Sequence, residues 1–210
     1  MMLRRIFLQA GLALGLAVVA CVLPATARAE SGDEARQYVE SLAQRAISTV
    51  ADKQISEKER DERFRNLFVS SFDIPEIGRF VLARYWRIAS PDQQQEFVRL
   101  FEEMTVLTWA KRFRDYSGEH LEALDSNRDG DHGWMIDSRI VRNQGPPIPV
   151  QWRLREGPEG LRVVDLIVEG VSLAITHRSD YGAAMQGNGG KIDALLSTMR
   201  TKIDQLKAAG

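Results

Sequence analysis

The spacing of apolar residues changes twice along this chain, and that change constrains the fold more than any other feature. From Ser31 to about Asp115, apolar residues recur at helical spacing. Between His120 and Val168 they alternate with polar residues, as in strands that bury one face, and helical spacing returns from Ala174. This order of helices, strands and helices predicts one α+β domain, whose strands pair antiparallel in sequence order.

Short polar motifs mark the starts of the predicted helices. Ser56 and Glu59 have the spacing of a capping box, in which each side chain binds the backbone amide of the other residue. Asp73 is the predicted cap of a short helix, and Ser90 precedes Pro91 at the start of a long helix that we expect to be buried on two sides. Helices are predicted over 31–52, from 56, over 74–86, over about 91–115, over 174–185 and over 192–206.

Strands are predicted over residues 120–124, 134–141, 150–155 and 161–168, which makes a four-stranded sheet. Residues 125–130, between the first two strands, match the first half of a calcium-binding loop. The twelfth position of such a loop needs a bidentate Glu but is Ile136 here, and strands flank the segment instead of helices. We therefore predict a hairpin turn at 125–130.

The first 29 residues have the pattern of a signal peptide. Arg4 and Arg5 precede a long apolar run, and Ala27-Arg28-Ala29 forms a small-residue cleavage site. This predicts an exported mature chain of residues 30–210. Two alternatives stay open: export by the twin-arginine route, and a lipoprotein tethered through Cys21. Cys21 is the only cysteine, so cleavage after Ala29 would leave a chain without a disulfide.

Charge and histidine spacing argue against two classes of function. The net charge is −1, and removal of the signal peptide takes away arginines but no acidic residue, so no basic block remains for nucleic acid. His120, His132 and His177 are scattered and lack the spacing of a metal site. We therefore expect neither a nucleic-acid partner nor a metal ion.

Residues 170–174, Gly-Val-Ser-Leu-Ala, come close to the G-x-S-x-G elbow that positions the nucleophile of many serine hydrolases. Ser172, with His177 and Asp165 nearby in sequence, would then form the triad of a small exported hydrolase. Ala174 replaces the closing glycine, and the strand pattern does not indicate the parallel sheet that the elbow needs. The hydrolase is therefore the less favoured hypothesis.

The favoured interpretation of the same stretch is structural. Gly170 would permit a turn out of the last strand, and Ser172 would cap the following helix. Asp165 lies within a strongly apolar strand, where a buried carboxylate needs donors. We expect it either to face outward or to pair with an arginine of a neighbouring strand, such as Arg139 or Arg153.

Three blocks of sequence carry a resemblance to a known family. The first is FDIPEIGRFVL at 72–82 with YWRIASPDQ at 85–93, the second runs over 97–116, and the third is RVVDLIVEGVSL at 162–173. In these blocks, and in their order, the chain is similar to the MlaC family of periplasmic phospholipid carriers, also called the toluene-tolerance Ttg2D family. One departure is Leu161, where the family commonly has a tryptophan.

The resemblance implies a fold and a function. The fold would be a curved antiparallel sheet packed against a layer of helices, with an apolar pocket between them. The protein would be a periplasmic carrier without catalytic activity, and its bound lipid would be cargo instead of a cofactor. It would shuttle phospholipid between an outer-membrane lipoprotein/porin complex and an inner-membrane ABC transporter complex, and so maintain lipid asymmetry. A hopanoid or other terpenoid lipid is the alternative cargo, from a branch of the same family.

Candidate pocket residues follow from the resemblance together with the strand and helix periods. Large apolar side chains fill a core and line a cavity equally well, so the sequence leaves both interpretations open. We expect exposed arginines at the rim, Arg79, Arg84, Arg87 and Arg112, to contact partner proteins. The predicted lipid-binding residues are Phe80, Val81, Tyr85, Phe101, Met104, Thr105, Trp134, Ile136, Val150, Trp152, Val164, Leu166, Val168 and Val171.

Overall fold

An antiparallel sheet and a layer of helices make up the fold, as predicted. The computed structural model describes residues 31–52, 54–113 and 118–208. The predicted signal peptide, its cleavage site and Cys21 lie outside these ranges. Within the described ranges, no helix combines the length and the apolar character needed to cross a membrane.

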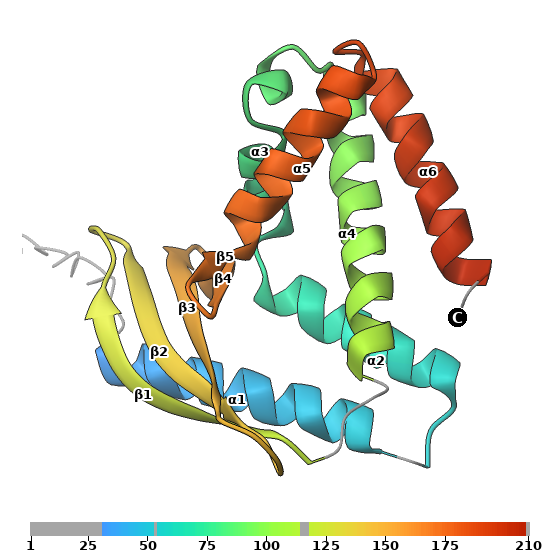
Figure 1. Ribbon diagram of the computed structural model, residues 1–210. Helices are drawn as coiled ribbons and strands as arrows, with labels where there is room; N and C mark the ends of the chain where they lie inside the picture. The colour runs from blue at the N-terminus through green and yellow to red at the C-terminus, as the bar shows by residue number, and fades with distance from the viewer. Residues whose placement is uncertain (1–30, 53, 114–117, 209–210) are drawn as a thin grey trace, which may run out of the picture.

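The sheet has five strands in the order β1-β2-β3-β4-β5, and each pairs antiparallel with the next. The strands are β1 (His120–Arg128), β2 (Gly133–Val141), β3 (Ile148–Gly157), β4 (Gly160–Val168) and β5 (Val171–Ser172). The prediction of four strands missed only β5, which is too short for periodicity to reveal. The sheet curls over helix α1 (Gly32–Ala51), which packs against β1 and β2 (Figure 1).

The remaining helices form a layer beside the sheet. They are α2 (Glu57–Ser71), α3 (Ile74–Leu82), the 3₁₀ helix η1 (Ala83–Arg87), α4 (Pro91–Phe113), α5 (Leu173–Gly187) and α6 (Ile192–Ala208). α4 stands in the middle of this layer and contacts α2, α3 and α6 (Figure 1). Phe97, Leu100 and Phe101 of α4 are all buried. Val106, nine residues after Phe97, is also buried and lies on the opposite side of the helix at 3.6 residues per turn, so α4 is covered on more than one side, as predicted.

Capping explains where the helices begin. Before α4, the Gln93 N–H donates to Ser90 Oγ at 3.2 Å, and the Ser90 N–H donates to Gln93 Oε1 at 3.0 Å, which completes a capping box. The box predicted before α2 is half present. Ser56 Oγ accepts from the Glu59 N–H at 3.2 Å, but the Glu59 carboxylate binds Arg63 instead of the Ser56 amide.

Helix α3 is shorter than predicted. Asp73 caps it as expected, with its carboxylate accepting from the Glu76 N–H at 3.0 Å. The helix ends at Leu82 because Ala83 has a φ of 54°, which an α-helix does not contain. The chain continues as η1 instead and turns before α4.

Strand β1 is longer than predicted, and the turn that follows it is correspondingly shorter. Residues 125–128 belong to β1, and the turn covers only residues 129–132. The β1–β2 register shifts between Ala123 and Ser126, where β1 contains one extra residue. A bulge of this kind accommodates polar residues within a strand, so the composition of 125–130 was a misleading turn signal.

Apolar side chains gather in two separate cores. The helical core lies among α2, α3, α4, α5 and α6 and includes Phe68 and Phe101. The sheet core lies between α1 and the inner face of the sheet and comprises Ala35, Val39, Leu42, Trp134, Ile136, Leu154, Leu161 and Val163. Phe72 packs against both cores, and its ring stacks on Phe68 with 4.4 Å between the centroids.

Strand β4 attaches the turn between α2 and α3 to the sheet. The Asp73 N–H donates to the Val163 carbonyl at 2.9 Å, next to a bridge between Phe72 and Val163. The Arg162 guanidinium donates to the Val69 and Ser70 carbonyls at the end of α2. These bonds satisfy carbonyls that the helix end would otherwise leave without partners.

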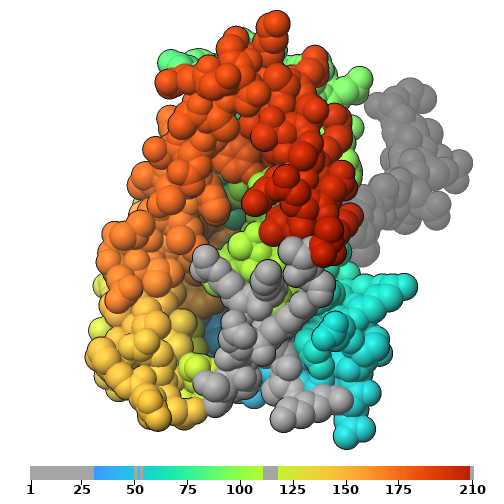
Figure 2. All heavy atoms as spheres, turned by 45° about the vertical axis from the view of Figure 1, so that its right-hand side comes forward, coloured from blue at the N-terminus to red at the C-terminus, as the bar shows by residue number. Residues whose placement is uncertain are grey.

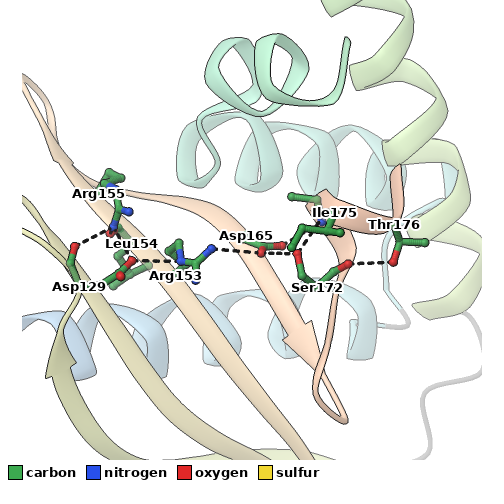
Figure 3. A network of polar contacts seen from close by, with 9 residues as sticks. Asp129, Arg153, Leu154, Arg155, Asp165, Ser172, Ile175 and Thr176 are labelled. Carbon is green, nitrogen blue, oxygen red and sulfur yellow. Dashed lines mark hydrogen bonds and ion pairs between the residues drawn. The ribbon is translucent and has the colours of Figure 1, made fainter. Parts of the chain in front are cut away.

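Strand β4 also anchors α5, through a buried carboxylate (Figure 3). Asp165 is 5% exposed and lies 3.7 Å from Nη1 of Arg153. Of the two predicted alternatives, facing outward and pairing with a neighbouring arginine, the pairing is therefore the one that forms. Its carboxylate accepts from Ser172 Oγ at 2.6 Å and from the Ala174 N–H at 2.9 Å. Ser172 Oγ in turn accepts from the Ile175 N–H at 3.0 Å, so Ser172 caps α5 as predicted.

Replacement of Asp165 is expected to destabilise the protein. Asp165→Ala leaves a buried N–H of Ala174 and the hydroxyl of Ser172 without an acceptor. Hydrogen bonds to a charged group are stronger than those between neutral groups, and loss of the carboxylate leaves its buried donors without a partner. We therefore expect the free energy of unfolding to fall by about 3 kcal/mol. Urea denaturation followed by circular dichroism measures this loss.

Glu122 provides the matched control. It forms an exposed ion pair with Arg139, at 2.7 Å, on the neighbouring strands β1 and β2. Because exposed pairs contribute little, we expect Glu122→Ala to leave the free energy of unfolding nearly unchanged. Equal losses in the two variants would contradict the anchoring role of Asp165.

Candidate apolar binding cavity

A cavity lies between the helical core and the sheet core. Its empty volume is about 1340 Å³, including the space that opens to solvent. Leu42 and Trp152, from the sheet side, and Phe64, Phe68 and Phe101, from the helical core, all line it. Figure 2 shows the surface hollowed between the orange of β3 and β4 and the green of α4. The cavity is therefore the space that remains where the two cores do not merge.

The sheet wall of the cavity follows from the pairing of β3 with β4. Trp152 pairs with Leu166 and Val150 pairs with Val168, and residues directly opposite in an antiparallel pair share a face. All four side chains line the cavity.

A register shift in β4 divides this face between the cavity and the sheet core. Leu154 pairs with Val163 and Arg153 pairs with Asp165, so Val164 is the extra residue. On one side of the shift, Val163 packs in the sheet core. On the other side, the even-numbered residues of β4 line the cavity, and Val164 itself reaches it.

The helical wall combines small and aromatic side chains. α1 contributes Ala43 and Ala46, which leave room, and α2 contributes Phe64, Leu67 and Phe68. From α4 come Phe101, Thr105 and Trp109, and from α5 come Leu173, Ala174 and His177. The cavity wall is therefore apolar over most of its area.

Half of the predicted pocket residues lie on the cavity wall. They are Phe101, Thr105, Val150, Trp152, Val164, Leu166 and Val168. The strand period placed the β3 and β4 residues on one face, and that face is the cavity wall. The contact of these side chains with lipid remains a prediction.

Two predicted residues face the same side of the sheet but do not reach the cavity. Trp134 pairs with Leu154, and Ile136 pairs with Trp152, so they share the inner face. Both are buried in the sheet core beneath α1. The sequence indicated the face correctly but did not reveal that α1 covers this half of it.

Five further predicted residues lie away from the cavity. Val81 is buried in the helical core, and Tyr85 packs against the outside of that core. Phe80 is 38% exposed beneath the Arg178 guanidinium, Met104 accepts a hydrogen bond from the Tyr181 hydroxyl, and Val171 is 57% exposed. α3 packs mainly against α5 and α4, and of its side chains Ile77 lines the cavity while Phe80 and Val81 do not.

Residues of α1 and α2 on the cavity wall were missed by the sequence analysis. They include Leu42, Ala43, Ala46, Phe64, Leu67 and Phe68. Apolar residues at helical spacing do not distinguish a helix face that packs on a sheet from one that borders a void. The small side chains of Ala43 and Ala46, one turn apart, were the one feature of the sequence that could have indicated a void beside α1.

The polar groups on the cavity wall differ in how they are bonded. Thr105 Oγ1 donates to the Phe101 carbonyl at 2.7 Å, and His120 lies 3.4 Å from the Glu122 carboxylate. Burial lowers the pKa of His177, although the carboxylates of Asp180 and Asp165 act in the opposite direction. The imidazole of His177 is therefore neutral at neutral pH.

The contacts of Ser172 do not have the serine–histidine–acid order of a catalytic triad. Its hydroxyl donates directly to Asp165 and accepts from the Ile175 amide, so no histidine stands between serine and acid. The named strands of the described sheet pair antiparallel, and Gly170, with a φ of 83°, provides the turn into β5. Within the described ranges, no group of three or more His, Cys, Asp or Glu side chains is placed to hold a metal ion.

Relatives and solved structures are similar to this chain over most of its length. The toluene tolerance protein ttg2D of Pseudomonas putida is 23% identical over 60% of this chain and 59% of its own length. The intermembrane phospholipid transport system binding protein MlaC of Haemophilus influenzae is 23% identical over 67% of each chain. A phospholipid-binding protein from Ralstonia solanacearum, solved in complex with a phospholipid, has the same fold, with a TM-score of 0.74 at 18% identity over 82% of this chain and 98% of its own.

The family assignment rests on a match that covers most of the chain. The match to the P. putida protein spans less than two thirds of that relative, so it does not by itself establish a family. The model of the MlaC protein family, however, matches residues 40–201, which include all three sequence blocks and the whole sheet. The chain therefore belongs to the MlaC protein family.

Proposed function

We propose that this protein is a periplasmic phospholipid carrier that holds the acyl chains of its cargo in the cavity between the two cores. The observation that carries this proposal is the apolar wall of a cavity that opens to solvent. Such a cavity shields hydrocarbon while a head group at the opening stays hydrated. Membership of the MlaC family supports the same function.

The physical basis of binding is removal of hydrocarbon from water. Each buried methylene group contributes about 0.8 kcal/mol, so even part of one acyl chain provides a substantial driving force. Spontaneous release would be correspondingly slow, because differences in affinity appear mainly in the dissociation rate. Delivery then requires a partner that changes the cavity.

The relatives favour phospholipid over a hopanoid as the cargo. The H. influenzae relative is named for phospholipid transport, and the R. solanacearum structure contains a phospholipid. Acyl chains also suit a cavity that runs between a curved sheet and several helices. The Ser172 hydroxyl is bonded to Asp165 and to the Ile175 amide, which supports a carrier without catalytic activity.

The proposed route of transport involves two membranes. Removal of residues 1–29 would release a mature chain of residues 30–210 into the periplasm. This chain would exchange lipid with an outer-membrane lipoprotein/porin complex and an inner-membrane ABC transporter complex. Arg79 and Arg87 are exposed and, among the described residues, form no ion pair, so they are available to acidic groups of a partner. The side chain of Arg112 lies outside the described part of the chain.

Lipid extraction from the purified protein tests the carrier function. Mature protein prepared from the periplasm is expected to contain phospholipid, which mass spectrometry identifies together with its chains. Lipid-free protein should also take up phospholipid from vesicles. Protein that is lipid-free as isolated and takes up none would overturn the proposal.

Changes to the cavity wall are expected to reduce the amount of bound lipid. Leu166→Glu places a charge in the apolar wall, where burial by an acyl chain would leave it without a partner. Ala46→Phe occupies part of the space itself. We expect each variant to retain at least about tenfold less lipid than the wild type in native mass spectrometry.

Leu124→Glu is the matched control for the charged variant. Leu124 is an apolar residue of β1 that is 46% exposed and does not line the cavity. We expect this variant to retain lipid as the wild type does. Equal retention by Leu124→Glu, Leu166→Glu and Ala46→Phe would mean that lipid binds elsewhere.

The neutral state of His177 is expected to make stability depend on pH. Burial lowers the pKa of His177 in the folded protein below the ordinary value of 6.5, so the unfolded chain binds the proton first as the pH falls. The free energy of unfolding of the lipid-free protein should therefore decrease below about pH 6.5 and be unaffected by this group well above it. His177→Phe should remove this part of the pH dependence, measured as urea midpoints between about pH 7.5 and about pH 5.5.

His132 is the control for that experiment, because it lies exposed in the turn between β1 and β2. His132→Phe should keep the wild-type pH dependence. An unchanged slope in His177→Phe would show that His177 is not the group responsible.

A further inference from the structure

His177, on the cavity wall, has two ring nitrogens without a hydrogen-bond partner among the described residues. His177 is half-buried on α5 and lines the cavity next to Leu173 and Ala174. Its ring meets the ring of Phe101 at 5.9 Å and nearly at right angles. Among the described residues, its two nitrogens have no hydrogen-bond partner, so the structure leaves a donor and an acceptor available in an apolar wall.

Other polar side chains on the wall are already engaged. The hydroxyl of Thr105 donates to the backbone of its own helix. The carboxylate of Asp165 accepts from Ser172 and Ala174 and pairs with Arg153. His177 is thus the wall residue best placed to offer a hydrogen bond to a bound molecule.

The charges around His177 determine which hydrogen-bond acceptor of a bound lipid suits its N–H. A neutral imidazole donates one N–H hydrogen bond and brings no positive charge. The carboxylates of Asp165 on β4 and Asp180 on α5 act on the same imidazole, while the α4 residues that line the cavity here, Phe101 and Thr105, are uncharged. Arg153 is already paired with Asp165, and no described Lys or Arg side chain lines the cavity, so an anionic phosphate group would find no free cation there. An uncharged carbonyl oxygen is the better acceptor at this position.

We propose that His177 recognises the ester linkage of acyl lipids, by donating its N–H to an ester carbonyl at the base of an acyl chain. This inference rests on the proposed carrier function and adds a specificity-determining residue to it. The ester is the polar group next to the hydrocarbon that fills the cavity, and a carbonyl drawn into an apolar wall needs a donor. His177 provides that donor at the border between the buried wall and solvent.

Comparison of ester-linked and ether-linked lipids tests the proposal. Lipid-free protein is loaded from vesicles that contain equal amounts of a diacyl phospholipid and its dialkyl ether analogue, with the same head group and chain length. Native mass spectrometry gives the ratio of the two bound lipids. We expect the wild type to prefer the ester roughly two- to tenfold, the range of one neutral hydrogen bond. The ether lacks the carbonyl but buries a similar amount of hydrocarbon.

Variants of His177 assign the preference to its side chain. His177→Phe and His177→Leu remove the donor and should bind both lipids with equal preference, and circular dichroism verifies that each is folded. His177→Gln retains an N–H donor and should keep part of the ester preference. His132→Phe makes the same substitution in an exposed turn away from the cavity and should keep the full wild-type ratio.

Two outcomes would overturn the proposal without affecting the carrier function. One is a wild-type protein that takes up both lipids without a preference, and the other is an ester preference that persists in His177→Phe and His177→Leu. If the wild type takes up neither lipid, the carrier function itself is overturned, and the proposed contact with the ester is overturned as well. The two failures are therefore distinguishable in one experiment.

Discussion

The helical layer is held to the sheet mainly through one strand, β4, and the rest of the structure depends on that attachment. At one end of β4, the carbonyl of Val163 accepts from the Asp73 amide in the turn between α2 and α3. Farther along, the buried Asp165 carboxylate accepts from Ser172 and Ala174 at the start of α5. Both contacts are directional hydrogen bonds, so they fix the positions of the helices relative to β4. Apolar packing of the helices over the entire sheet is not needed for this.

Attachment at one strand explains why the interior is hollow. α1 covers the inner face of the sheet only in part, and the helical core closes on itself around Phe97 and Phe101. Phe72 is a contact common to both cores, and the space beyond it is the cavity. A protein that filled this space with side chains would gain stability from packing. This protein leaves it open, and in the proposed carrier a bound acyl chain would provide the missing contacts.

Much of the fold was predictable because it depends on local signals. The sequence contains the signals for the caps at Ser90 and Asp73 and for the period of two in β2 to β4. It also indicated the pairing of Asp165 with Arg153 as one of the alternatives for that carboxylate. The errors arose where backbone geometry overrode composition. The positive φ of Ala83 ends α3 earlier than predicted. Residues 125–128, predicted to be part of a turn, continue β1 beyond the bulge between Ala123 and Ser126.

The sequence by itself determined the fold class, the family and the face of β3 and β4 that borders the cavity, because period and motif are properties of neighbouring residues. Only the tertiary structure decided which apolar residues line a void. Trp134 and Trp152 share one face of the sheet, yet α1 buries the first and leaves the second on the cavity wall. The stretch from Arg162 to Leu173 shows the same division. Its pattern identified a strand and a cap, while the long-range contacts of Asp165 and Val163 showed that it joins the two layers.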